Sequence, residues 1–240
     1  MDDTAPYAYF EDINWGLLRL WGSRRGLNVL DVGCGFATTA QRIREIGNHV
    51  VGIESNADAA NVARKRIDDV IETDLQNADA LTDQRFDVII FADVLEHLAW
   101  PIGVLKRYVR FLKPNGSMIV SLPNVGLWSV RLGLMFGRFH YVESGVLDRT
   151  HLRFFTRSSA VQMLRAAGLE PFRRTYNPGL VRPFVPLARK ALGGSGDPGS
   201  ILESAPYRAY VKTVYPVERV IARLWPGLLA FQMILEARAR

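Results

Sequence analysis

The sequence predicts an α/β fold in which helices flank a doubly wound, mostly parallel sheet. Short apolar runs alternate with helix-compatible segments over the first 122 residues, and this alternation is typical of βαβ units. The first run ends at Asp31-Val32 and is followed at once by Gly33 and Gly35. A glycine turn after a buried strand lets the backbone approach a ligand closely. We therefore expect the functional site at the carboxyl edge of the sheet.

A length of 240 residues allows one large domain or two small ones, and the pattern of elements described below favours a single domain over residues 1–240. The chain is 48% hydrophobic and 22% charged, which is enough apolar content for a sizeable core. The acidic start, Met1-Asp2-Asp3, is unlike a signal peptide, and no run approaches 18 uncharged apolar residues. The single cysteine, Cys34, excludes an internal disulfide and a multi-cysteine zinc site. We expect a cytoplasmic protein without a metal.

The charge is distributed unevenly along the chain. Residues 1–120 hold 13 basic and 17 acidic residues, whereas residues 121–240 hold 17 and 7. Such asymmetry can mark a nucleic-acid or membrane-surface face. The basic residues of the second half are scattered rather than clustered, which favours a solvated face or an anionic substrate over nucleic acid.

The elements are expected in a fixed order along the chain. A helix through Leu17 and Leu20 precedes the first strand. The expected alternation then continues as helix Thr38–Ile46, strand His49–Glu54, helix Ala57–Arg66, a strand near Val70-Ile71, strand Arg85–Phe91, helix Ile102–Leu112 and strand Ser117–Leu122. Lys113-Pro114-Asn115-Gly116 is a helix stop signal with a turn.

The second half departs from this alternation at two insertions, residues 123–156 and 177–226. Between them, Thr156 is a suitable N-cap for a helix over Ser158–Ala167, which Gly168 ends. Strands are expected at Leu169–Tyr176 and Leu228–Ala237. The run Gly193–Ser200 is a glycine- and serine-rich linker, so the second insertion is expected to be a cap or docking segment.

Three motifs suggest a family. Position 38 is Thr, which breaks the dinucleotide fingerprint, and no P-loop ending is present. The stretch Asp31–Ala37 resembles motif I of class I S-adenosylmethionine-dependent methyltransferases, D/E-x-G-x-G-x-G, with Ala37 in place of the third glycine. Phe86–His97 is similar to motif IV and its following helix, and K-P-x-G before the fifth strand recurs in the same class. The resemblance implies a seven-stranded sheet whose last strand is antiparallel, at the sheet edge.

Two patterns resemble a narrower bacterial subgroup. They are S-L-P-N-x-G-x-W-x-V-R-L at 121–132 and D-x-T-H-L-R-F-F-T at 148–156. The subgroup includes MetW-like proteins and enzymes encoded with polysaccharide and lipid-glycan genes. By this resemblance, residues 123–156 form a lid over the substrate.

The resemblance implies S-adenosyl-L-methionine as the cofactor. Glu54 ends the second strand 23 residues after Asp31, where a doubly wound fold places the acid that binds ribose hydroxyls. Asp74 would accept from the adenine amine and Leu75 would contact the ring through its backbone; alternatively, Thr73 or Asp74 caps a helix. The implied cofactor residues are Asp31, Gly33, Cys34, Gly35, Glu54, Ser55, Asp74, Leu75, Ala92 and Asp93.

Two histidines are candidate bases. His97 follows the fourth strand and could take a proton near neutral pH, or it could simply bond backbone in a first helical turn. His151 has Asp148 and Arg153 beside it, which supply an orienting carboxylate and a cation. Alternatively, His151 and Arg153 bond backbone carbonyls and pin the lid while Phe154 and Phe155 anchor it.

The function expected from these residues is O-methylation of a small-molecule, glycan or lipid-linked acceptor. N- or carboxyl methylation stays open, as does a MetW-like, non-catalytic partner of an acyltransferase in methionine biosynthesis. A homodimer is possible, no nucleic acid is expected, and membrane contact would be at most peripheral through amphipathic residues 180–192 and 217–225.

Overall fold

A computed structural model describes residues 13–76, 81, 84–181 and 205–240. Its seven strands form one sheet in the order β3-β2-β1-β4-β5-β7-β6. The strands are β1 (Asn28–Val32), β2 (His49–Glu54), β3 (Asp69–Glu72), β4 (Phe86–Ala92), β5 (Leu112–Pro123), β6 (Leu169–Pro178) and β7 (Ala230–Ala239). The first five pair in parallel, and β7 is antiparallel to both neighbours. The predicted mixed α/β sheet is confirmed.

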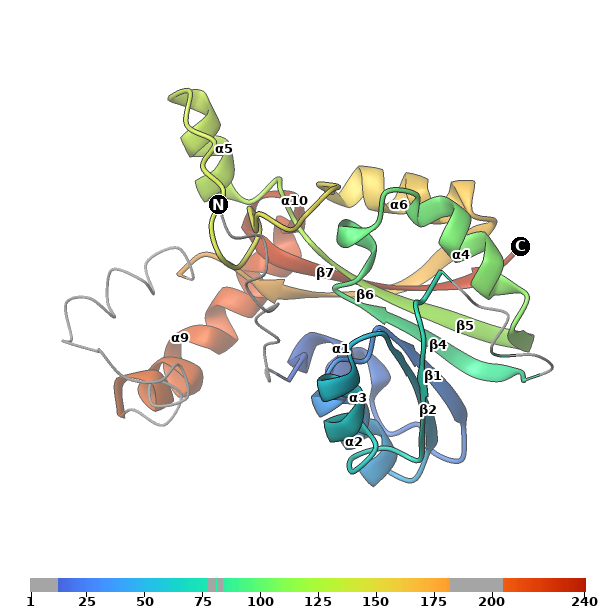
Figure 1. The fold of residues 1–240 in the computed structure, drawn as a ribbon. Coiled ribbons are helices and arrows are strands. Elements are labelled where there is room, and N and C mark those ends of the chain that lie inside the picture. Colours follow the sequence, from blue (N-terminus) through green and yellow to red (C-terminus); the bar gives the residue numbers. More distant parts are fainter. Residues whose placement is uncertain (1–12, 77–80, 82–83, 182–204) are drawn as a thin grey trace.

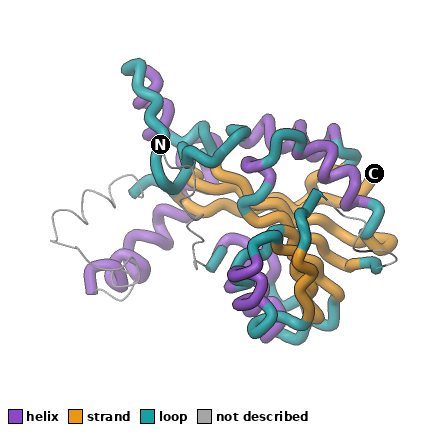
Figure 2. The backbone as a smooth tube through the Cα atoms, viewed as in Figure 1, coloured by secondary structure: helices purple, strands orange, loops and turns teal. Residues whose placement is uncertain are grey.

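Helices cover both faces of the sheet, as Figures 1 and 2 show. One face carries α1 (Trp15–Trp21), α2 (Thr38–Glu45) and α3 (Ala57–Ala63), and the other carries α4 (Pro101–Val109) and α6 (Arg157–Ala166). Each set buries its own apolar cluster against the strands. Because β1 and β4 are buried on both faces, they are continuous apolar runs, which is why the sequence revealed them.

The seventh strand is not at the sheet edge, which corrects the expectation. It lies between β5 and β6, pairing Ser121 with Ile234 on one side and Thr175 with Ile234 on the other. Its residues Met233, Ile234 and Leu235 are buried, and a central position covers such a run on both faces. The half-exposed β6 forms the edge instead.

The helix before β5 is shorter than predicted. It ends at Val109, and the strand already begins at Leu112. The Lys113–Gly116 turn is therefore a bend inside β5, where Asn115 has a φ of 66°. A Cβ on Gly116 would approach the carbonyl oxygens of Lys113, Asp87 and Phe86 to 3.0–3.1 Å, so only glycine fits this close approach.

The two insertions lie at the same end of the sheet. Residues 123–156 contain α5 (Trp128–Met135), which projects from the body in Figure 1. The second insertion contains α9 (Ala205–Leu224) and α10 (Pro226–Leu229). Tyr215 of α9 accepts a hydrogen bond from Arg19 of α1 at 3.1 Å. The expected Gly193–Ser200 linker lies outside the described residues. No helix in the described part combines the length and apolar character needed to cross a membrane.

Candidate functional site

The glycine turn after β1 is built as the sequence predicted. The amides of Gly33 and Cys34 both donate to the carbonyl oxygen of Ile53, at 2.8 and 3.0 Å. Gly33, Gly35 and Ala37 all have positive φ, of 70°, 52° and 56°. This left-handed conformation is costly for a residue with a Cβ, so Ala37 is strained at the position where the motif that the sequence resembles has a glycine.

Two buried carboxylates lie beside this turn. Glu54, which is 4% exposed, accepts hydrogen bonds from the amides of Gly35 and Asn56, both at 2.8 Å. Asp31 is 6% exposed, and its Oδ1 has no hydrogen-bond partner among the described residues. Burial and the Glu54 charge raise the pKa of Asp31 from 3.8 to about 7. This pair of carboxylates is suited to a cationic ligand, because a cation would relieve both effects.

The other predicted cofactor residues surround this pair at the strand ends. Ser55 is exposed directly after β2, and Asp74 is exposed after β3. Asp74 Oδ1 accepts from the amide of Gln76 at 2.8 Å, which is a local turn. The Leu75 carbonyl accepts from Tyr108 at 2.7 Å. Cys34 packs against Gly52, and burial raises the pKa of its thiol. Cys34 is therefore an uncharged packing residue of the turn.

Asp93, at the end of β4, leads to a polar network that the sequence did not reveal. Its carboxylate accepts from Gln232 Nε2 of β7 at 2.6 and 2.7 Å. Ser121 is fully buried and accepts from Asn14 at 3.2 Å. Asn177 of β6 donates to Asn14 and Gln232. Single polar residues within apolar strands carry no periodic signal, so only the strand order shows that they meet.

The two candidate histidines lie together, although 54 positions separate them in the sequence. The ring centroids of His97 and His151 are 4.8 Å apart at an interplanar angle of 71°. They meet because the amides of Leu152 and Arg153 donate to the Glu96 carbonyl, at 2.8 and 2.9 Å. The 123–156 segment thus returns to the end of β4.

The Asp148 carboxylate is linked to the His97 ring through Thr150 rather than to the His151 ring. Its Oδ1 accepts from the Thr150 hydroxyl at 2.7 Å and from the Thr150 amide at 2.8 Å. The Thr150 hydroxyl and carbonyl oxygens each lie 3.2 Å from His97 Nδ1. Because the Thr150 hydroxyl gives its proton to Asp148, both Thr150 oxygens accept from His97 Nδ1–H. This leaves the lone pair on Nε2.

His151 and Arg153 make the contacts expected of residues that pin the lid. His151 Nδ1 lies 3.2 Å from the Val146 carbonyl, and the exposed Arg153 donates to the Ala99 carbonyl at 2.8 Å. Phe155 is 7% exposed and belongs to the main core. These contacts hold the ring of His151 beside His97 without using its Nε2.

Glu96 is an acidic residue that was not among the predicted site residues. It is 1% exposed, and its Oε2 has no hydrogen-bond partner in the part of the chain that the structure describes. Burial, with the nearby charges of Asp93 and Asp148, raises its pKa well above 4.5. Burial and His151 lower the pKa of His97, so His97 is neutral near pH 7 and able to accept a proton.

The glycine turn with its two carboxylates and the histidine cluster lie at the same edge of the sheet. Val32 pairs with Phe91 across β1 and β4, so the glycine turn and Asp93 follow at the same level. A Cβ on Gly33 would approach Val94 Cγ2 to 2.8 Å. The arrangement therefore joins a carboxylate-lined, glycine-rich ligand site to a histidine–carboxylate cluster.

A family model described as a methyltransferase domain matches residues 7–172. A ubiquinone biosynthesis O-methyltransferase from Ruegeria pomeroyi is 31% identical over 163 residues, covering 64% of this chain and 65% of that protein. The chain thus spans about 65% of the length of this relative.

Solved structures share the fold. A SAM-dependent methyltransferase from Archaeoglobus fulgidus has a TM-score of 0.59 at 17% identity, covering 92% of this chain and 90% of that one. Magnesium protoporphyrin IX methyltransferase from Synechocystis, solved with bound SAH, has a TM-score of 0.55 at 15% identity, covering 93% and 79%.

Proposed function

The chain belongs to the methyltransferase domain family, and from this premise we propose that it transfers a methyl group from S-adenosylmethionine to a hydroxyl oxygen of its acceptor. The observation that carries the proposal is the buried pair of Asp31 and Glu54 beside the glycine turn, joined at Gly33 and Val94 to a cluster able to accept a proton. The similarity to O-methyltransferases supports oxygen as the acceptor atom.

The residues at the turn fit this cofactor. Asp31 Oδ1 is buried and has no partner among the residues that the structure describes, and a cofactor with an ammonium and a sulfonium group supplies the cation that such a group needs. Glu54 lies at the end of β2 beside the glycine turn and accepts the Gly35 and Asn56 amides, so its carboxylate is placed where a doubly wound fold binds ribose hydroxyls, and we assign it that role. When bound, the cofactor supplies an electrophilic methyl group on a sulfonium whose sulfur leaves as a neutral thioether.

Alignment and water exclusion would provide most of the rate. Holding two reactants in an attacking geometry is worth up to about 7–11 kcal/mol. The hydrogen-bonded network that contains Asp93, Gln232 and Asn14 holds the end of β4 in place beside its neighbouring strands. At the acceptor side, the Glu96, His97 and His151 cluster would remove the hydroxyl proton, a contribution of roughly two to four powers of ten.

The lid favours an acceptor with an apolar part, such as a lipid-linked one. Exposed large apolar side chains gather on α5 and the loop after it. They are Leu132, Leu134, Met135, Phe136, Phe139 and Tyr141. Arg131, Arg138 and Arg149 on the same segment are also exposed, which suits an acceptor that carries an anionic group.

The test is a turnover assay that detects S-adenosylhomocysteine formation with a panel of hydroxyl, amine and carboxylate acceptors. We expect product with a hydroxyl acceptor and none with the amine or carboxylate analogue of the same molecule. Methylation of the amine or carboxylate alone would overturn the choice of oxygen. Cofactor binding without turnover on any acceptor would favour the MetW-like, non-catalytic alternative.

A further inference from the structure

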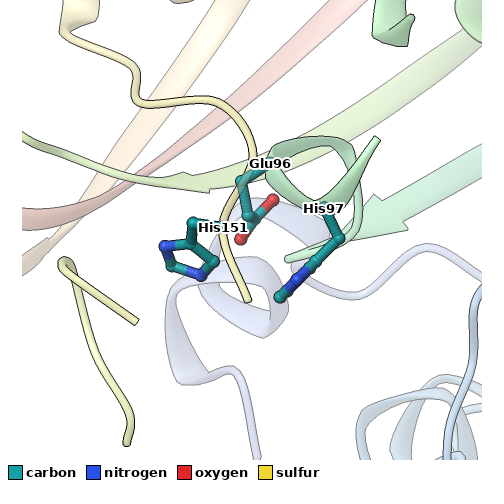
Figure 3. A group of neighbouring side chains, drawn as sticks. All are labelled: Glu96, His97 and His151. Atoms are coloured by element: carbon teal, nitrogen blue, oxygen red, sulfur yellow. The ribbon is translucent and has the colours of Figure 1, made fainter. Parts of the chain in front are cut away.

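The cluster at the end of β4 has the composition of a metal site. Candidate ligand atoms of Glu96, His97 and His151 all lie within 4.8 Å of one another. In Figure 3 the Glu96 carboxylate lies between the two imidazole rings. Glu96 and His97 come from η2 (Leu95–His97), and His151 comes from the returning lid segment. The cluster therefore forms only when the lid is folded against the sheet.

Glu96 supplies the strongest indication of a missing partner. Its side chain is 1% exposed, and Oε2 has no hydrogen-bond partner among the described residues. A buried carboxylate without a partner is costly, and the group is stable only when it takes a proton or a cation. The Thr150 hydroxyl of the returning segment is not available to Glu96, because it donates to Asp148.

Both histidine rings present the nitrogen that a metal would need. His97 Nδ1 contacts the Thr150 carbonyl and hydroxyl oxygens, and His151 Nδ1 contacts the Val146 carbonyl, all at 3.2 Å. An Nδ1–H that donates to a backbone carbonyl orients the ring and leaves Nε2 as a lone-pair donor. This is the outer arrangement that metal-binding histidines usually have.

We propose that Glu96, His97 and His151 bind one divalent transition-metal cation. Two imidazoles and one carboxylate are the donors that Zn²⁺ and its neighbours accept, whereas Mg²⁺ prefers oxygen ligands throughout. Metal–ligand distances of about 2.0–2.2 Å place ligand atoms about 3–3.5 Å apart, so the cation would draw the three side chains together. Three protein ligands leave a fourth position open.

The open position gives the cation a role at the acceptor, and this step rests on the proposed O-methylation. A hydroxyl oxygen that occupies the position has a lowered pKa. The cation would then favour loss of the O–H proton to water, with the electron pair left on the acceptor oxygen. With the cation bound, His97 and His151 act as ligands, so the cation would activate the acceptor in place of the imidazole base of the proposed function.

Metal binding is measured without cofactor or acceptor, so the result does not depend on the proposed reaction. The full chain is stripped with a chelator, dialysed, and titrated with Co²⁺, whose visible absorption reports the ligand field; Zn²⁺ then competes. We expect one Co²⁺ per chain, displaced by Zn²⁺. Glu96→Gln and His151→Gln should weaken binding by more than 10-fold, because even the loss of a group that only supports a ligand costs about 10–100-fold.

The matched control is His49→Gln, because His49 lies 3.6 Å from Asp68 and is the other histidine–carboxylate pair. It should bind Co²⁺ as the wild type does. Glu96→Gln replaces a buried carboxyl group whose Oε2 has no partner among the described residues, so its thermal midpoint should equal or exceed that of the metal-free wild type. No binding to the folded wild type, or binding lost in His49→Gln and kept in Glu96→Gln, would overturn the proposal.

Turnover measured before and after metal removal with a chelator separates the metal-site proposal from the proposed O-methylation. If turnover is found, it should fall on metal removal and return with Zn²⁺ or Co²⁺. Turnover that survives complete metal removal would overturn the catalytic role of the cation while leaving O-methylation intact. Metal binding without turnover would leave the site in place and count against the proposed function.

Discussion

The two halves of the site differ in how they are held. Around Glu54, both carboxylate oxygens accept backbone amides that are no more than 19 positions away in the sequence. Around Glu96, the neighbouring groups come from a segment more than 50 positions later, and one carboxylate oxygen has no partner among the described residues. The proposed cofactor side is thus organised by a local turn, whereas the proposed acceptor side depends on the packing of residues 123–156 against the end of β4.

This difference predicts that the two halves respond separately to substitution. Changes on the acceptor side should affect turnover and leave cofactor affinity unaltered. Changes on the cofactor side should affect affinity and the stability of the ligand-free protein.

The largest effect is expected at His97. Replacing His97 with Ala removes the nitrogen that Asp148 and Thr150 orient, so turnover should fall by roughly 10²–10⁴-fold. The assay is S-adenosylhomocysteine formation at saturating cofactor, with His140→Ala, an exposed histidine of the same lid, as the control. Full turnover in a folded His97→Ala protein would show that His97 takes no part in the reaction.

The next effect concerns Asp31 and pH. Because the folded pKa of Asp31 is raised to about 7, its contribution to stability is present below pH 4 and is lost as pH rises through 7. The loss is about 4 kcal/mol at most. Asp31→Asn should therefore make the ligand-free protein more stable than wild type at pH 8, with a much smaller gain at pH 5.

Chemical denaturation at the two pH values measures this effect. Identical pH dependence in the wild type and Asp31→Asn would mean that Asp31 is not the strained group. Cofactor binding to the variant should weaken in either case, because the cofactor's cationic group loses the buried carboxylate of Asp31 as its partner.

A smaller effect is expected at Ala37. Its φ of 56° is left-handed, a conformation that costs a residue with a Cβ about 1–2 kcal/mol. Ala37→Gly removes this cost and adds unfolded-state entropy, so the net gain should be about 1 kcal/mol or less. Denaturant midpoints measure it. Destabilisation would show that the Ala37 methyl, which is buried in the core, contributes more than the strain it causes.

The geometry of the glycine turn was easier to predict from the sequence than that of the histidine cluster, for a physical reason. Buried parallel strands are apolar runs, and the turn needs its glycines, so Asp31, Gly33 and Glu54 are recognisable from neighbouring residues alone. Glu96 lies within the Phe86–His97 motif, but its burial depends on a later segment whose Leu152 and Arg153 amides donate to the Glu96 carbonyl. Gln232 reaches Asp93 across 139 positions, and no local pattern predicts such a contact.

The order of the strands in the sheet was also harder to predict than the strands themselves. The bounds of β2 were predicted correctly, whereas the interior position of β7 was not. An apolar strand at the end of a chain fits several places in a sheet. Its pairing with β5 and β6 is decided by packing between elements rather than by the strand's own residues.

The separation of the two halves is tested most directly by calorimetric titration of S-adenosylmethionine into three proteins. They are the wild type, Glu54→Ala and His97→Ala. Losing hydrogen bonds to a charged group costs about 1.5–3 kcal/mol, so Glu54→Ala should bind about 10- to 150-fold more weakly. His97→Ala should bind as the wild type does. Equal affinity in the wild type and Glu54→Ala, or an equal loss in both variants, would contradict the account.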